Sequence, residues 1–318
     1  MNLSTRAACA GIALMVAHCA TAQACSVPVF RYALERWPAD PYQIMVFHKG
    51  RLSGAAAATL DALRKAADSA ECFACFSVST FDVGHGLDES ARTIWQAQKN
   101  PVLPWVVVRY PDSPDDAPSA WSGPLLSPQL ATLLDSPFRR SLVSRLMKGD
   151  SVVWVLVESG DAARDEAAWR LLEQQLPRLQ KEIQLPSVDA DDPDIQGPPL
   201  RSKLPLKVVF SRMRLSRRAA GEEIFLSMLL NCEGNPPPAD QPALAPVFGR
   251  GRVLGLLSGK QISAESIEDA ACFLCGPCSC QVKQLNPGVD LLMAADWDGL
   301  VEDGSPKQPK LPALPAGR

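Results

Sequence analysis

The sequence predicts an α/β protein in which the same order of secondary-structure elements occurs twice. Short apolar runs with the length of buried strands alternate with longer segments whose apolar residues recur at helical spacing. In each half of the chain, two short strands and a last helix follow the second helix. A hydrophobic content of 47% allows a sizeable core. Strands and helices that alternate in this way favour a largely parallel central sheet.

The first half can be assigned in chain order. Tyr42–His48 is an apolar run typical of a buried strand, and Ser53–Ser69 is an Ala/Leu-rich helix that Ser53 can cap. The remaining elements are the strand Phe76–Val83, the helix Asp88–Lys99, the strands Leu103–Tyr110 and Ala120–Leu125, and the helical stretch Ser127–Met147, which Pro137 interrupts.

The second half repeats this order. Ser151–Glu158 is again a strand, and Ala162–Ile183 is a long helix. They are followed by the strand Leu206–Met213, the helix Ala219–Leu230, the hairpin strands Pro246–Gly249 and Val253–Leu257, and the helix Ser263–Leu274. We therefore predict two β-α-β-α-β-β-α units, residues 25–149 and 150–301, followed by a proline-rich disordered tail over 302–318.

The first 24 residues are typical of a cleavable secretory signal peptide. Arg6 ends a short n-region, an apolar stretch covers 7–16, and 22–24 reads Ala-Gln-Ala, a small-residue cleavage pattern. Cleavage leaves Cys25 first, and Gln23 fits a lipoprotein signal poorly, which favours simple cleavage over a lipid anchor on Cys25. We expect an exported, periplasmic or secreted protein with no transmembrane segment after cleavage. A net charge of −3 gives no basic footprint for nucleic acid.

The order of elements resembles the thioredoxin-like fold, in two tandem copies. In that family a cis-proline precedes the third strand. Pro104 and Pro246 occupy the matching positions, at the start of the third predicted strand of each unit. The resemblance covers nearly all of residues 40–300 and rests on element order and these prolines. Residues 25–48 are also similar to the start of uncharacterised exported bacterial proteins, a likeness that implies no activity.

The segment from Cys275 to Cys278 reads Cys-Gly-Pro-Cys, the tetrapeptide of the thioredoxin active site. In that family the first cysteine lies at the N-terminus of the helix after the first strand, where the helix dipole stabilises a thiolate. Here the corresponding segments, 49–52 and 159–162, contain no cysteine. Cys275 ends a predicted helix instead, and Gly276 followed by Pro277 is a helix stop with glycine in the left-handed conformation. We favour a structural role over a catalytic one.

The other cysteines leave several alternatives open. In an oxidising compartment all eight that follow the signal peptide are candidates for disulfides of undetermined connectivity: Cys25, Cys72, Cys75, Cys232, Cys272, Cys275, Cys278 and Cys280. Cys72 and Cys75 form a second pair that could exchange thiols, although no Gly or Pro turn or basic neighbour accompanies it. A thiolate metal site over Cys272–Cys280 is a weaker alternative to a disulfide, so we predict no metal centre.

No other constellation predicts a cofactor. His48 and Glu158 end the two first strands, where α/β sheets bind ligands, and His85 lies in a glycine-rich loop that would meet His48 only if it folded back. The aspartates of 189–194 match a calcium loop poorly, because Pro193 takes a ligand position. No hydrolase elbow, Walker motif or dinucleotide fingerprint is present.

These observations favour a non-catalytic scaffold or binding module of the cell envelope, although the ligand and partner are not specified and an envelope protein is one candidate partner. Loops 111–120 and 184–205 would supply the contacts. The alternative is a thiol–disulfide oxidoreductase that uses Cys275 and Cys278 or Cys72 and Cys75. A thiolate metal carrier is a third hypothesis.

Overall fold

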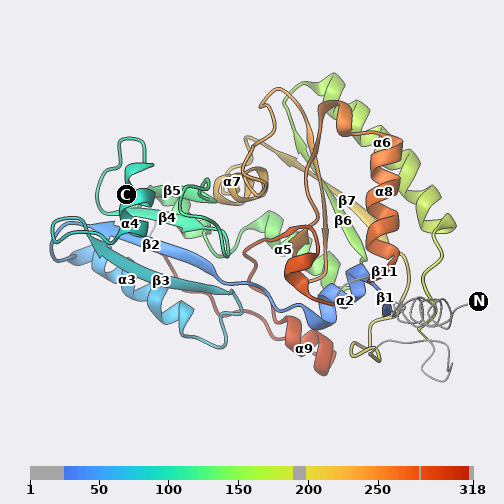
Figure 1. Ribbon diagram of the computed structural model, residues 1–318, viewed down its shortest axis with the longest axis horizontal. Coiled ribbons are helices and arrows are strands. Elements are labelled where there is room, and N and C mark those ends of the chain that lie inside the picture. The colour runs from blue at the N-terminus through green and yellow to red at the C-terminus, as the bar shows by residue number, and fades with distance from the viewer. Residues whose placement is uncertain (1–24, 189–197, 279–280, 315–318) are drawn as a thin grey trace, which may run out of the picture.

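Two mixed β-sheets with the same core strand order organise the protein (Figure 1). The computed structural model describes residues 25–188, 198–278 and 281–314. In the first sheet, of order β3-β2-β4-β5, β2 is parallel to β3 and antiparallel to β4. Its strands are β2 (Tyr42–His48), β3 (Phe76–Asp82), β4 (Trp105–Arg109) and β5 (Trp121–Pro124).

The second sheet repeats these relations around β6. Its order is β12-β9-β8-β6-β7, and β6 is parallel to β7 and antiparallel to β8, while β10 pairs with β8. The strands are β6 (Val152–Glu158), β7 (Phe210–Ser216), β8 (Ala243–Phe248), β9 (Arg252–Val253), β10 (Leu257–Ser258) and β12 (Val289–Asp290). Each sheet has one parallel pair among the described strands, so the largely parallel arrangement expected from sequence is wrong. The α/β class is confirmed, and the topology is compatible with a thioredoxin-like fold.

Helices follow the strands in the predicted sequence. The helices of the first half are α3 (Gly54–Ala67), α4 (Glu89–Gln96), the 3₁₀ helix η2 (Pro128–Thr132) and α5 (Pro137–Met147). Those of the second half are α6 (Ala162–Glu182), α7 (Glu223–Leu230) and α8 (Ala264–Cys275). In space α5 contacts β6 and β7 of the second sheet, and α7 contacts β5 of the first. Pro137 begins α5 rather than breaking a longer helix, and the Ser136 hydroxyl accepts the Arg139 N–H across this start. Proline suits a first helical position because its missing N–H has no intrahelical partner there.

Two elements of the second half begin later than the sequence predicts. β7 starts at Phe210 rather than Leu206, because the Ser151 side chain bonds the backbone that precedes it. The Ser151 hydroxyl donates to the Lys207 carbonyl over 2.8 Å and accepts the Val209 N–H over 3.0 Å. Helix α7 starts at Glu223 rather than Ala219, after a turn.

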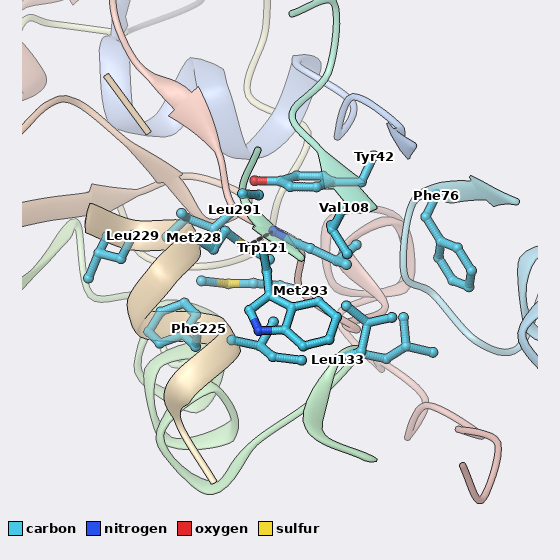
Figure 2. Close-up of a cluster of buried hydrophobic side chains, with 14 of the residues drawn as sticks. Tyr42, Phe76, Val108, Trp121, Leu133, Phe225, Met228, Leu229, Leu291 and Met293 are labelled. Atoms are coloured by element: carbon cyan, nitrogen blue, oxygen red, sulfur yellow. Dashed lines mark hydrogen bonds between the residues drawn. The ribbon is translucent and has the colours of Figure 1, made fainter. Parts of the chain in front are cut away.

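One hydrophobic core joins the two sheets. Tyr42, Val108 and Trp121 of the first sheet pack in the same cluster as Phe225 and Met228 of α7, which Figure 2 shows in close-up. Hydrogen bonds also join α7 to the first half of the chain. The Tyr110 hydroxyl donates to the Met228 carbonyl, and the Ser227 hydroxyl donates to the Ala120 carbonyl over 2.7 Å. The two sheets therefore share a core.

The N-terminal segment packs with the second sheet. Strand β1 (Cys25–Pro28) pairs antiparallel with β11 (Pro277–Cys278), and helix α2 (Val29–Arg36) follows it (Figure 1). Phe30 and Ala33 of α2 lie in a second core, together with side chains of β6, α6 and α8. Residues 25–36 thus belong in space to the second sheet, so a boundary at residue 149 does not separate two independent cores.

A buried ion pair anchors α2. Arg31 and Glu35 are almost fully buried and are 2.6 Å apart. The Arg31 guanidinium also donates to the carbonyls of Ser202 and Leu204, and the Glu35 carboxylate accepts the N–H groups of Arg201 and Ser202. These hydrogen bonds satisfy both charges inside the protein, which is the condition under which a buried pair is tolerated.

Residues 303–314, expected to belong to a disordered tail, pack on the protein after α9 (Trp297–Glu302). The Lys310 N–H donates to the Glu71 carbonyl over 2.9 Å, and the Lys310 ammonium pairs with the Glu71 carboxylate over 2.7 Å. Leu314 is buried in the shared core. The apolar residues of this proline-rich segment supply the burial that an unstructured tail lacks. Among the described residues, no helix has the length and apolar character needed to cross a membrane.

Candidate functional site

The carboxyl ends of β2 and β3 form the edge at which α/β sheets bind ligands. β2 ends at His48 and β3 ends beside it at Asp82. The Asp82 carboxylate accepts the N–H groups of Gly50 and Gly84, at 3.1 and 2.8 Å, and lies 2.9 Å from the His85 ring. These bonds lower the pKa of Asp82, the Gly84 N–H contributing most. Asp82 thus joins the loop after β2 to the turn after β3.

The two histidines nevertheless have different partners. His48 Nδ1 lies 2.7 Å from the Gly50 carbonyl, whereas His85 contacts Asp82 and its side chain is 82% exposed. Among the described residues, no group of three His, Cys, Asp or Glu side chains is arranged to hold a metal ion. The aspartates of the calcium-loop hypothesis, and Cys280, lie outside the described residues.

The proline positions distinguish the two sheets. The only cis peptide bond in the described ranges joins Leu103 to Pro104, directly before β4, and the next residue, Trp105, pairs with Phe47 near the end of β2. Pro246 differs from the expectation: it lies inside β8 opposite Trp154, and its peptide bond is not cis.

The register identifies a different proline as the equivalent of Pro104. Ala243 pairs with Val157, one residue before the end of β6, as Trp105 pairs with Phe47. Pro242 therefore takes the equivalent place. Sequence reasoning missed it because β8 was expected to begin at Pro246, although Pro242 could have been found from the same segment.

Neither helix that follows a first strand begins with a cysteine. In the first sheet, residues 49–53 lead into α3 at Gly54, and the Ser53 side chain makes no cap bond. In the second, the Asp165 carboxylate accepts the N–H groups of Ser159 and Gly160, at 2.7 and 2.9 Å, and Asp161 caps α6. Asp165 is 5% exposed, so the loop before α6 is closed by a carboxylate of its own helix.

Cys275 is the last residue of α8, as the sequence predicted. Its side chain is fully buried in the second core, and this burial raises the pKa of its thiol to about 12, with Cys272 contributing further. The C-terminal end of a helix carries the negative end of its dipole, which disfavours a thiolate as well. Cys278 is buried in β11, where its backbone pairs with Cys25.

Gly276 does not have the left-handed conformation that the sequence suggested. Its φ is −73°, and the chain leaves α8 extended into β11. A side chain would place a Cβ atom 2.9 Å from the Cys272 carbonyl oxygen, and the Gly276 carbonyl accepts the Val29 N–H over 3.0 Å. Glycine is thus required by close approach of the backbone rather than by a positive φ.

The remaining described cysteines are also poor thiolates. Cys272 is exposed on α8, and desolvation, followed by Glu268 and Asp269, raises the pKa of its thiol. Cys232 is buried, which raises the pKa of its thiol to about 12.

Cys72 and Cys75 lie between α3 and β3. Cys72 is fully buried and Cys75 is half-buried, and desolvation raises the pKa of both thiols. At Cys75 the charge of Asp40 raises the pKa further, whereas Lys283 lowers it. The turn between the cysteines has Phe73 at a φ of 57°, so a left-handed turn forms without the glycine that sequence reasoning looked for.

A buried arginine organises one of the loops expected to make contacts. Arg109 is 2% exposed at the end of β4, and its guanidinium donates to the carbonyls of Ser113, Pro114 and Asp115. These bonds hold 113–115 to the sheet. No sequence motif predicts that Arg109 holds this loop, and only its hydrogen bonds in the structure show it.

A second charged cluster was also missed. Asp290 is buried and pairs with Arg252, at 2.9 Å, and with Lys283, which also lies 2.8 Å from Asp40. The Tyr42 hydroxyl donates to the Asp290 carbonyl over 2.7 Å. The cluster links β2 and the residues just before it to β9 and β12, and its two positive and two negative charges balance.

The chain matches no known family model and no curated protein sequence.

Proposed function

We propose that this chain is an exported, tandem thioredoxin-like protein that serves as a non-catalytic scaffold or binding module of the cell envelope. The repeated core strand order, the helices after each first strand, and the equivalent positions of Pro104 and Pro242 support the tandem assignment. The signal-like residues 1–24 support export. Mass spectrometry of the protein recovered from an exporting cell tests the cleavage site and the state of Cys25.

The non-catalytic assignment rests on one observation: no cysteine lies at the N-terminus of α3 or α6, the two helices that follow the first strand of each sheet. A thioredoxin-like redox centre needs an accessible cysteine where the helix dipole lowers its pKa. The segments before α3 and α6 contain none, and the loop before α6 is closed by Asp165. Cys275 lies at the opposite end of its helix, fully buried and with a raised pKa.

The contact surfaces would be the loops around the shared core. The 111–120 loop is held by Arg109. Of the 184–205 loop, the structure describes 184–188 and 198–205, and there the Arg201 guanidinium donates to the Glu35 carbonyl over 3.1 Å, while the Pro199 carbonyl accepts a bond from Arg36. Backbone that is fixed at such points before binding loses less conformational entropy on contact with a partner. This arrangement suits a binding module whose partner is an envelope protein.

A thiol–disulfide oxidoreductase is the second candidate, and one observation favours it. Cys75 is half-buried, and it is three residues from Cys72 across a left-handed turn. Lys283 lowers the pKa of the Cys75 thiol, although desolvation and Asp40 outweigh it. This pair is thus a better candidate for exchange than Cys275.

Reduction of insulin disulfides with dithiothreitol separates these functions. We expect the exported protein to show the background rate, and Cys75→Ser and Cys275→Ser variants to match it. Thioredoxin serves as the positive control. Turnover above background that Cys75→Ser abolishes would establish the oxidoreductase function at Cys72 and Cys75, and loss in Cys275→Ser would establish it at Cys275.

A further inference from the structure

A cavity of about 240 Å³ lies between α5 and the C-terminal segment. Val143 and Met147 of α5 form one apolar wall. Ala295, Pro306 and Pro309 form the opposite wall. Pockets for drug-sized ligands begin at about 300 Å³, so this cavity is suited to a smaller molecule with an apolar body.

The C-terminal wall is fixed at a distance from α5. The Asp296 carboxylate caps α9 by accepting the Gly299 N–H over 2.9 Å, and it also accepts the Lys307 N–H over 2.8 Å. Three residues later, Lys310 bonds to Glu71 through both its backbone and its side chain. These contacts hold the segment at two points, so the cavity is a built feature of the fold.

The charges around the cavity are unbalanced. Arg140 pairs with Asp135, and buried Arg139 donates to the carbonyls of Leu133 and Leu292. Two further lining residues, Lys148 and Lys307, are exposed and form no ion pair with any residue in the described ranges. Both ammonium groups are therefore available to an anion.

We propose that this cavity binds a small organic carboxylate with an apolar tail. The tail would pack between Val143, Met147 and the two prolines, where burial of apolar surface favours binding. The carboxylate would meet Lys148 and Lys307 at the rim, where charge-assisted hydrogen bonds are available. This inference does not depend on the proposed scaffold function, since it concerns a different part of the surface.

Calorimetric titration with three probes tests the two parts of the site separately. Octanoate has both the charge and the tail, octan-1-ol has only the tail, and acetate has only the charge. We expect octanoate to bind with a Kd at least tenfold lower than either of the others. Equal binding of octanoate and octan-1-ol, or no binding of octanoate, would overturn the proposal.

Variants then locate the site. A Lys148→Gln/Lys307→Gln double variant should raise the Kd for octanoate at least fivefold. Lys65→Gln is the matched control, because Lys65 is an exposed lysine of α3 that does not line the cavity. Ala294→Leu, at a half-buried lining position, should fill the cavity and abolish binding while the melting temperature is kept. Unchanged octanoate affinity in the folded double variant, or in folded Ala294→Leu, would place the ligand elsewhere and refute the assignment.

Discussion

The two central strands, β2 and β6, have the same neighbours but very different surroundings. In β6 alternate residues enter two large cores: Val153 and Val155 face the core shared by the sheets, and Trp154 faces the core built with α2, α6 and α8. In β2 one face enters the shared core, but Met45 and Phe47 face a small cluster covered by α4. The difference indicates that the second sheet is the stable centre of the protein.

The loops that follow β6 and β2 also differ, the first being closed and the second more exposed. The loop after β6 is closed by buried Asp165, whereas the loop after β2 lies beside Asp82 and exposed His85. The first sheet also has the cis bond at Pro104, and the second has no cis bond at Pro242. The second sheet therefore supplies stability, and the first presents the more exposed strand ends.

The largest expected effect is at Trp154. We expect Trp154→Ala to lower the free energy of unfolding by about 3–5 kcal/mol, because it leaves a cavity in a closed core. Trp95→Ala, in the small cluster of the first sheet, should cost about 1–2 kcal/mol, because Trp95 is only half-buried. Urea unfolding of both variants measures the difference.

A second substitution at Trp154 separates the cost of the cavity from the effect of losing the indole N–H. The buried Trp154 indole N–H has no hydrogen-bond partner among the residues that the structure describes, so Trp154→Phe removes an unsatisfied donor while keeping an aromatic ring. Its cost should be well below that of Trp154→Ala. Equal costs for Trp154→Ala and Trp95→Ala would contradict the difference between the two sheets.

The next effect concerns the N-terminal strand. The register of β1 and β11 sets the backbones of Cys25 and Cys278 opposite each other, and cross-strand Cα separations fall within the range that a disulfide spans. We propose that these residues form a disulfide in the oxidised protein. Cys278→Ser should then destabilise the oxidised protein by about 2–5 kcal/mol and have a much smaller effect under reducing conditions.

Non-reducing peptide mapping checks this directly. A peptide containing Cys25 joined to one containing Cys278 is the expected product, and it would exclude a lipid on the Cys25 sulfur. An acylated Cys25 would refute the disulfide and place the protein on a membrane.

A smaller effect is expected where α2 meets the β8–β9 turn. Gly249 has a φ of 57°, and a Cβ atom there would lie 2.7 Å from the Ala33 Cβ of α2. We expect Gly249→Ala to cost about 2–4 kcal/mol from the left-handed conformation and the clash together. Gly160→Ala, at a φ of 90° with open space around it, should cost about 1–2 kcal/mol. Similar thermal shifts in the two variants would show that α2 is not tightly packed there.

The smallest effect is at Asp82. Its folded-state pKa is lowered by the Gly84 N–H, so the stability it contributes is present above its unfolded pKa and is lost as the pH falls through the folded value. Carbon-detected NMR titration should give a pKa below the ordinary value of 3.8. His85→Gln should keep most of the shift, because the Gly84 bond remains. Full return to the ordinary value would show that His85 causes it.

The sequence predicted what depends on local pattern. The strands β2 and β6 were found because both faces of each are buried, which produces an uninterrupted apolar run. The place of Cys275 at a helix end followed from Gly276 and Pro277. Helix α2 was not found, because its burial depends on Arg31 and Glu35 bonding to residues near 202, far along the chain. Pro242 was missed because its role depends on strand register, which a single strand's sequence does not specify.

The decisive measurement for the non-catalytic assignment is the rate at which iodoacetamide labels reduced Cys275 in the native protein, followed against pH. We expect almost no labelling of Cys275 up to pH 9, because the thiol is fully buried and burial raises its pKa to about 12. Cys272 in the same sample serves as the internal reference: its pKa is also raised, but its side chain is exposed, so it should label faster than Cys275 at each pH. Fast labelling of Cys275 with an apparent pKa below 7 would reveal a reactive thiolate and contradict the non-catalytic assignment.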